Sequence, residues 1–445
     1  MPVSPARRIA FDILLRVEER EAYSSELLAG PRINDPALSH EDRALAYEIV
    51  MGVLRWRSLL DHEIAHFSFT PMQKLDAEVL TALRIGVYQL RYLTRIPKHA
   101  AVTESVELVK CAKKSSAAGL ANAVLRKVSS AKAAPATHSL AAQYAHPEWI
   151  LTRWRERFGD TAAAAICQWD QQPPPTHIRI AAGHDPHCVL RELAADAVHC
   201  QPAELLRNCW RVTEGALIGS TAFRQRKVVI QDQGSQLVGW LAAAAARVLA
   251  PRRILDCCAA PGGKTMQLAE TFPDAHTVAA DLHPRRASML RRLCSHPQLQ
   301  VIAADAGALP FYPGTFDLVL ADVPCSGTGT LARNPEIKWK LTAADITDLA
   351  ARQQKIARGA LAQVRPGGVL VYSTCSLERD EDEHIIETVL SNGGATIIPA
   401  AEVLALIPEL DRDRIADIIS GNFLRLVPGN SAHCDGFFAA ILRKH

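Results

Sequence analysis

Short apolar runs that alternate with helix-forming stretches dominate the chain from residue 236 onward. Apolar runs of this length are typical of buried parallel strands, and the stretches between them are long enough for crossover helices. The pattern therefore predicts a C-terminal Rossmann-like α/β domain with a doubly wound sheet. The expected strands are Arg253–Cys257, His276–Asp281, Leu299–Asp305, Phe316–Ala321 and Gly368–Tyr372.

The 445 residues are enough for two or three domains that each bury a core. Residues 1–140 carry long helix-period stretches and predict an all-α bundle, and residues 141–230 mix helices with strand-like pieces and predict a small α/β linker domain. Residues 231–445 form the Rossmann-like domain. Expected helices are 41–67, 73–93, 99–113 and 117–128, expected strands of the linker domain are 176–180 and 227–230, and an alanine-rich linker is expected at 129–139.

Composition restricts the function classes. No apolar run approaches the roughly 18 residues of a membrane helix, and Asp12 and Arg16 interrupt the N-terminal apolar stretch, which predicts a first helix and no export signal. We therefore expect a cytoplasmic protein whose 11 cysteines are reduced. No Cys-x-x-Cys pair exists, so no metal site is expected. Residues 1–140 hold 19 Lys+Arg against 15 Asp+Glu, a small basic excess that favours a polyanionic partner only slightly.

A glycine-rich turn follows the first expected strand of the Rossmann-like domain. Glycines let a cofactor approach the backbone, and the helix that follows offers unpaired N–H groups. The turn lacks the glycine that a Walker A loop needs at position 258, and the dinucleotide fingerprint is absent, so S-adenosylmethionine is a better candidate than ATP or NAD. The candidate cofactor-binding residues of this turn are Cys258, Ala259, Ala260, Pro261, Gly262, Gly263 and Lys264.

Two acids end the next two expected strands. Asp281 lies about 20 residues beyond the turn, the spacing at which a carboxylate binds ribose hydroxyls in Rossmann-type nucleoside sites. Asp305 ends the following strand and could receive an adenine amine. A simpler alternative for Asp281 is a helix cap.

Two cysteines follow two further expected strands, Cys325 in Asp322-Val-Pro-Cys-Ser and Cys375 in Ser373-Thr-Cys-Ser. Ligands and chemistry collect at the carboxyl ends of parallel strands, so two thiols at this edge predict a reaction that uses sulfur. Asp322 is expected beside the target base or the methionine end of the cofactor, and Lys264 could pair with Asp322 or with the cofactor carboxylate. The alternative is that both cysteines are buried packing residues.

These motifs resemble the RNA cytosine-C5 methyltransferases of the NOL/NOP/Sun family. The resemblance spans residues 229–442 and rests on motifs that occur in the expected order. The N-terminal part resembles the helical NusB-type domain at Leu54-Arg-Trp56 and Asn122-Ala-Val-Leu-Arg126. The two resemblances together indicate the bacterial Fmu/RsmB branch. The motifs are Asp256-Cys-Cys-Ala-Ala-Pro-Gly-Gly-Lys-Thr265, Asp322-Val-Pro-Cys-Ser-Gly-Thr-Gly329, Arg333-Asn-Pro-Glu-Ile-Lys-Trp339, Ser373-Thr-Cys-Ser376 and Asp435-Gly-Phe-Phe438.

The resemblance implies methylation of a cytosine in small-subunit ribosomal RNA by a Rossmann-like domain that uses S-adenosylmethionine. It further implies that Cys375 is the nucleophile and that Cys325 assists release; the residues alone leave the reverse open, because DNA cytosine methyltransferases attack with a Pro-Cys cysteine. We expect a monomer with RNA as its partner. Two alternatives are a non-catalytic RNA-binding or assembly factor, disfavoured by the intact cysteine pair, and a DNA cytosine methyltransferase, disfavoured by the Thr-Cys motif.

Overall fold

The computed structural model describes residues 3–19, 22–132, 139–431 and 433–445. The chain forms two compact units, one of Met1–Pro173 with Leu331–Lys340 and the other of Pro174–Thr330 with Leu341–His445. The division at residues 140 and 230 stays a prediction, and the linker expected at 129–139 falls largely on residues 133–138, outside the described part. Among the helices of the described ranges, none combines the length and hydropathy that a bilayer crossing requires.

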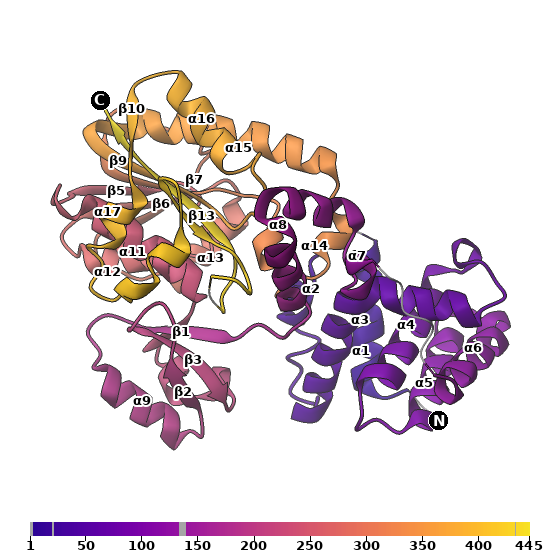
Figure 1. The fold of residues 1–445 in the computed structure, drawn as a ribbon. Helices are drawn as coiled ribbons and strands as arrows, with labels where there is room; N and C mark the ends of the chain where they lie inside the picture. Colours follow the sequence, from indigo (N-terminus) through magenta and orange to yellow (C-terminus); the bar gives the residue numbers. More distant parts are fainter. Residues whose placement is uncertain (1–2, 20–21, 133–138, 432) are drawn as a thin grey trace. The chain divides into compact units, whose positions relative to one another are not determined.

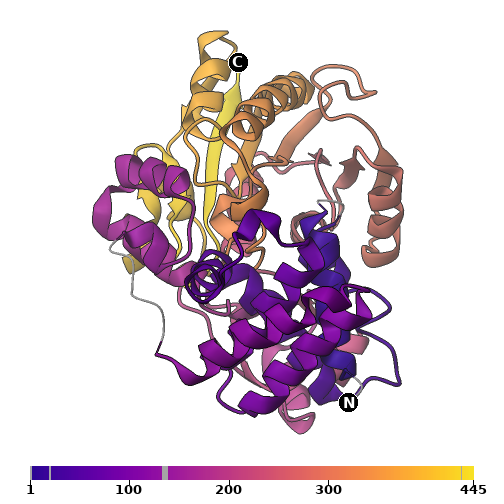
Figure 2. The same cartoon turned by 90° about the vertical axis from the view of Figure 1, so that its right-hand side faces the viewer.

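The first unit is helical throughout its described part (Figures 1 and 2). The predicted all-α bundle is therefore confirmed. Its core is aliphatic, and the long helix α3 begins where the Ser39 side chain accepts the N–H of Asp42. The α-helices are α1 (Pro5–Glu18), α2 (Ser24–Leu28), α3 (His40–Phe67), α4 (Ala77–Tyr92), α5 (Lys98–Cys111), α6 (Ala118–Ser130), α7 (Leu140–Gln143), α8 (Glu148–Asp170) and α14 (Ile337–Lys340). Two 3-10 turns, Met72–Lys74 and Ser115–Ala117, complete the unit.

The Leu331–Lys340 segment belongs to the helical unit, although its motif lies within residues 231–445, where the Rossmann-like domain was predicted. Buried Glu336 accepts the backbone N–H of Ser24 at 2.8 Å and its hydroxyl at 2.9 Å. The indole of Trp339 donates to the Leu54 carbonyl at 2.6 Å. These contacts satisfy backbone groups of the helical unit with residues that arrive some 300 positions later.

The second unit begins with a four-stranded antiparallel sheet of order β2-β3-β1-β4. Helix α9 packs Val189 and Leu193 against Ile178 of its central strand (Figure 1). The small α/β domain predicted here is confirmed. Its elements are β1 (Thr176–Ile180), α9 (Pro186–Ala195), β2 (His199–Pro202), β3 (Cys209–Glu214), a 3-10 turn (Leu217–Gly219), α10 (Thr221–Arg224) and β4 (Val228–Ile230).

The same unit holds a nine-stranded sheet of order β11-β12-β13-β9-β8-β5-β6-β7, with β10 paired to β13. Pairing is parallel from β7 through β6, β5 and β8 to β9 and antiparallel beyond. The predicted Rossmann-like domain is confirmed, and the antiparallel extension is an addition that the sequence patterns did not indicate. The strands are β5 (Arg253–Asp256), β6 (His276–Asp281), β7 (Leu299–Ala303), β8 (Phe316–Asp322), β9 (Val364–Thr374), β10 (Ala395–Ile398), β11 (Ile419–Ser420), β12 (Phe423–Leu426) and β13 (Phe437–Lys444).

Helices cover both faces of the large sheet, because alternate strand residues point to opposite sides. Leu318 and Leu320 join the core beneath α11, α12 and α17, whereas Val319 and Ala321 join the core beneath α15 and α16 (Figure 1). The helices and turns are α11 (Gln233–Arg247), α12 (Gly263–Thr271), α13 (Pro284–Leu293), a 3-10 turn (Thr328–Thr330), α15 (Ala343–Gln363), α16 (Glu383–Ser391), α17 (Ala400–Leu404) and two 3-10 turns (Arg412–Arg414, Ala416–Ile418).

Replacing Glu336 with alanine should destabilise the helical unit by about 2–4 kcal/mol, because the buried Ser24 N–H and hydroxyl lose their shared acceptor. Chemical denaturation followed by circular dichroism measures the change. The matched control is Glu26→Ala, which removes an exposed acid from α2, the helix that holds Ser24. It should change the free energy of unfolding by less than about 0.5 kcal/mol. Equal effects of the two substitutions would contradict the structural role of Glu336.

Candidate active site

The glycine-rich turn joins β5 to α12 at the centre of the parallel sheet. Gly262 caps the helix with φ of 110°, and a Cβ there would lie 2.2 Å from the Cys294 sulfur, so the position requires glycine. The N–H of Ala259 donates to the Ala280 carbonyl at 2.9 Å, which fixes the turn beside β6. The candidate residues Cys258, Ala259, Ala260, Pro261 and Gly262 occupy the turn, and Gly263 and Lys264 open α12.

Lys264 pairs with Asp322, one of the two partners that we considered for it. Lys264 Nζ lies 2.7 Å from Oδ2 of Asp322 at the end of β8, and the Ser373 hydroxyl donates to Oδ1 at 2.7 Å. The ammonium also lies 5.1 Å from the ring centre of Phe437. The pair joins the first residues of α12 to the end of β8, across the point where the strand order reverses, which is where open α/β sheets bind their ligands.

Asp281 and Asp305 lie at and just beyond the ends of β6 and β7, two paired parallel strands. Asp281 is buried; one oxygen accepts the His283 N–H at 3.0 Å, and Arg286 lies 3.6 Å from the other. Asp305 accepts the Gly307 N–H at 2.8 Å and binds Lys355 at 3.0 Å, and these contacts lower its pKa. Asp281 does not cap α13, whose N-cap residue is His283, and it lies at the edge of the sheet where a ribose could reach it.

Cys325 and Cys375 come together although 50 residues separate them. β8 and β9 are paired with Asp322 opposite Ser373, and each cysteine follows within three residues. The two sulfurs lie 3.2 Å apart, and both residues are partly exposed. The N–H of Gly329 donates to the Cys375 carbonyl at 2.9 Å and ties the two turns together. Cys375 also packs against the core cluster beneath α11, as the packing alternative expects, but packing alone does not explain why the two sulfurs face each other.

The environment of the Cys325 thiol favours its protonated form. The hydrogen bond with Cys375 is the largest cause that raises the pKa of the Cys325 thiol, followed by burial and then by the charges of Cys375 and Glu381. Either sulfur of the pair could donate to the other.

The structure adds buried acids that the sequence patterns did not indicate. Asp256, at the end of β5, is buried and accepts the Thr265 hydroxyl at 2.6 Å. Glu381 and Asp382 follow the Thr-Cys motif in the acidic run Glu378–Glu383, which has the composition of a solvated surface, yet neither has any exposed area. The available signal was the proximity of that run to Cys375. Within the described residues, no group of three His, Cys, Asp or Glu side chains is arranged to hold a metal ion.

Comparison with known proteins places this site in a family. Family models match residues 246–443 as 16S rRNA methyltransferase RsmB/F, 4–130 as the NusB family and 146–217 as the ferredoxin-like domain of RsmF/B-like methyltransferases. The probable ribosomal RNA small subunit methyltransferase B of Bacillus subtilis is 31% identical over 461 aligned positions that cover 100% of both chains. The chain belongs to the RsmB/F family of 16S rRNA methyltransferases. The predicted Fmu/RsmB resemblance, with its NusB-like domain, is confirmed.

Further relatives agree with this family assignment. The ribosomal RNA small subunit methyltransferase B of Yersinia pestis is 32% identical over 392 positions, covering 82% of this chain and 88% of the relative. Among crystal structures, that of the protein PH0851 matches with a TM-score of 0.80 and 22% identity over 100% of both chains. A methyltransferase homologue from Pyrococcus horikoshii has a TM-score of 0.54 and 24% identity over 69% of this chain and 98% of its own. These structures are similar in fold.

RsmB/F methyltransferases use S-adenosylmethionine, as predicted for this chain. The residues of the site fit that molecule. Gly262 and Gly263 let the turn pack against Cys294 and Gln231, and the first N–H groups of α12 and Lys264 suit the carboxylate of the methionine part. Asp281 and Asp305 suit the ribose hydroxyls and the adenine amine.

Burial makes the stability of the fold depend on pH through Asp256. It raises the pKa of this carboxyl from 3.8 to about 7, so folding favours the protonated acid. The protonated Asp256 carboxyl stabilises the fold fully at a pH below 3.8, the pKa of the carboxyl in the unfolded chain. This stabilisation is lost as the pH rises through about 7, its pKa in the folded chain. Asp256→Asn keeps an acceptor for Thr265 but cannot ionise. The natural protein therefore loses stability between pH 6 and pH 8, and the variant does not lose this contribution. Calorimetry should show that the melting temperature of the variant minus that of the natural protein increases from pH 6 to pH 8. A constant difference would contradict a raised pKa of Asp256.

Proposed function

We propose that this chain transfers a methyl group to C5 of a cytosine in small-subunit (16S) ribosomal RNA, through a covalent bond between Cys375 and C6. The observation that carries the proposal is the 3.2 Å separation of the Cys325 and Cys375 sulfurs at the sheet edge that also holds Lys264 and Asp322. RNA is then the substrate and the partner. We place the reaction in the cytoplasm and assign it to a monomeric enzyme.

The chemistry explains why a thiol is needed next to a cytosine. C5 is a poor nucleophile, but when the thiolate of Cys375 adds to C6, the electrons of the C5–C6 double bond shift to give an enamine that is nucleophilic at C5. The bound S-adenosylmethionine supplies the methyl group. Asp322, held by Lys264 and Ser373, is in place to accept hydrogen bonds from the target base.

Cys325 serves the two ends of this sequence. As a protonated thiol, Cys325 can stabilise the Cys375 thiolate by an S–H to sulfur hydrogen bond before the attack. After methylation, a base must take the C5 proton; the electrons of the C5–H bond then restore the C5–C6 double bond while the C6–S bond breaks and Cys375 leaves as a thiolate. We assign assistance of this release to Cys325.

The predicted domain division follows from these roles. Residues 1–140 form the NusB-like, RNA-binding domain, whose small basic excess suits phosphate contacts. Residues 141–230 form the linker domain, and residues 231–445 carry the methyl transfer. In the described structure, the helical unit also includes Leu331–Lys340, which supports extending the proposed RNA-binding part to that segment.

Asp281→Ala should weaken S-adenosylmethionine binding by about 1.5–3 kcal/mol, the value of a lost charge-assisted hydrogen bond to the ribose. Isothermal titration calorimetry of the full chain measures this change. Asp274→Ala, which removes an exposed acid from the loop between α12 and β6, is the control and should bind like the natural protein. Tight ATP binding without S-adenosylmethionine binding would refute the cofactor assignment.

The two cysteines should give opposite results on substitution. Cys375→Ala should abolish both methylation and any covalent RNA adduct, because no enamine can form. Cys325→Ala should still attack and then stall as a protein–RNA conjugate that survives a denaturing gel. Unmethylated 16S ribosomal RNA is the substrate, and bisulfite sequencing of the RNA shows whether the natural chain produces a resistant cytosine.

Cys111→Ala provides the control, because it removes an exposed thiol from the helical unit. It should methylate normally and accumulate no conjugate. A conjugate with Cys375→Ala but not with Cys325→Ala would reverse the two roles. A conjugate with neither variant, while the natural chain methylates C5, would contradict the two-cysteine mechanism.

A further inference from the structure

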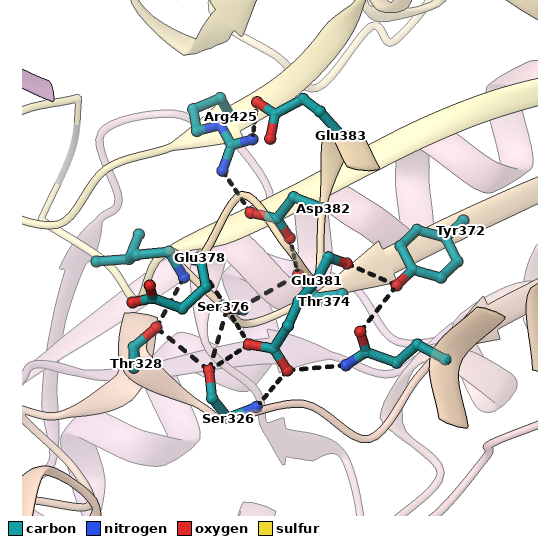
Figure 3. A network of polar contacts seen from close by, with 12 residues as sticks. Ser326, Thr328, Tyr372, Thr374, Ser376, Glu378, Glu381, Asp382, Glu383 and Arg425 are labelled. Carbon is teal, nitrogen blue, oxygen red and sulfur yellow. Dashed lines mark hydrogen bonds and ion pairs between the residues drawn. The ribbon is translucent and has the colours of Figure 1, made fainter. Parts of the chain in front are cut away.

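A network of buried polar groups links the turns that follow β8 and β9 (Figure 3). Its centre is the Glu381 carboxylate, which has no exposed area and lies between β9 and α16. The carboxylate accepts hydrogen bonds from the N–H and hydroxyl of Ser326, the hydroxyl of Ser376 and the side-chain amide of Gln353. A buried acid surrounded in this way is satisfied as an ionised acceptor, although burial itself raises its pKa.

Glu381 binds the residue that follows each cysteine. Ser326, next to Cys325, donates its N–H to Oε1 at 2.8 Å and its hydroxyl to Oε2. Ser376, next to Cys375, donates its hydroxyl to the same Oε2 at 2.5 Å. One carboxylate therefore bridges two turns that come from different parts of the chain, as the dashed contacts in Figure 3 show.

Elements outside the two turns hold this carboxylate in place. Gln353 of α15 donates to Oε1 at 2.9 Å and also to the carbonyl of Pro324, the residue before Cys325, at 2.9 Å. The Tyr372 hydroxyl donates to the Glu381 backbone carbonyl at 2.7 Å. The orientation of Glu381 is thus set by α15 and β9, and it can act as a fixed point for both turns.

We propose that Glu381 is a positioning residue that holds the Cys325 and Cys375 turns together, so that the Cys325 thiol faces the Cys375 sulfur before the attack. Its role in catalysis rests on the proposed two-cysteine mechanism, whereas its role in holding the sulfurs together does not. The carboxylate acts through its hydrogen bonds with Ser326 and Ser376. None of the hydrogen bonds described above joins it to either sulfur.

Three variants separate this role from general stability. Glu381→Ala removes all the contacts of the carboxylate. Glu381→Gln keeps the size and one carbonyl oxygen, and the serine hydroxyl groups can rotate to accept from its amide. Glu383→Gln is the matched control, because it removes an ion pair with Arg425 in the same segment without touching either cysteine turn.

The first measurement needs no RNA. Diamide takes two electrons and two protons from a pair of thiols and joins them as a disulfide, and peptide mass spectrometry quantifies the link between Cys325 and Cys375. Glu381→Ala should form this link at least about tenfold more slowly than the natural chain, whereas Glu381→Gln and Glu383→Gln should stay within about threefold, because the rate follows how often the two sulfurs meet. An unchanged rate in Glu381→Ala would overturn the positioning role.

The second measurement is methylation of 16S ribosomal RNA. Glu381→Ala should lower kcat by about 10²-fold with little change in the KM for S-adenosylmethionine, and Glu381→Gln should restore most of the rate. If Glu381→Gln formed the disulfide at the normal rate but methylated RNA as slowly as Glu381→Ala, positioning could not be the reason for the loss of kcat. If neither the natural chain nor any variant methylates C5, the proposed function fails. The disulfide rates then still decide whether Glu381 holds the two sulfurs together.

A third variant covers the case in which Glu381→Ala does not fold, which circular dichroism would show. Ser376→Ala removes only the contact of the carboxylate with the Cys375 turn. The Ser376→Ala variant should form the disulfide more slowly than the natural chain, but faster than a chain in which the carboxylate contacts neither cysteine turn. A rate equal to that of the natural chain would overturn the proposal.

Discussion

The parallel pairing of β8 with β9 is the constraint on which the rest of the site depends. The pairing places Asp322 opposite Ser373, and a shift of one residue would turn every side chain of one strand to the other face of the sheet. In this register, Ser373 contacts Asp322, and the two following turns bring the cysteine sulfurs together. The buried aliphatic residues of both strands fix the register, so the core of the sheet determines the geometry of the chemistry at its edge.

Much of this arrangement could be predicted from sequence. The predicted parallel strands form, and the acids and cysteines lie where parallel strands end, because apolar period and strand direction are local properties of the chain. The Glu381 network could not be predicted, because six consecutive residues rich in Asp and Glu have the pattern of a solvated surface. Only the tertiary fold brings the donors of Ser326, Ser376 and Gln353 to that acid. The assignment of Leu331–Lys340 to the helical unit depended on equally distant contacts.

Buried charge is distributed around the cysteines in two different ways. Lys264 and Asp322 form an ion pair near the ends of the strands, where a ligand could compete for either partner. In the described structure, Glu381 accepts its hydrogen bonds from neutral donors of Ser326, Ser376 and Gln353. A carboxylate that neutral dipoles stabilise does not need to exchange partners during a reaction, whereas an ion pair can open. The site thus combines an adaptable contact on the side of the cofactor turn with a rigid one beneath the thiols.

The place of Leu331–Lys340 in the helical unit has a consequence for synthesis of the chain. A ribosome releases residues 1–173 first, yet Ser24 and Leu54 obtain their partners Glu336 and Trp339 only when the second unit has been translated through β8 and the turn that holds Cys325. Domains generally fold in order of emergence from the ribosome. Here the first unit stays incomplete until its own segment Leu331–Lys340 has been made, and by then residues 174–330 of the second unit have also been translated.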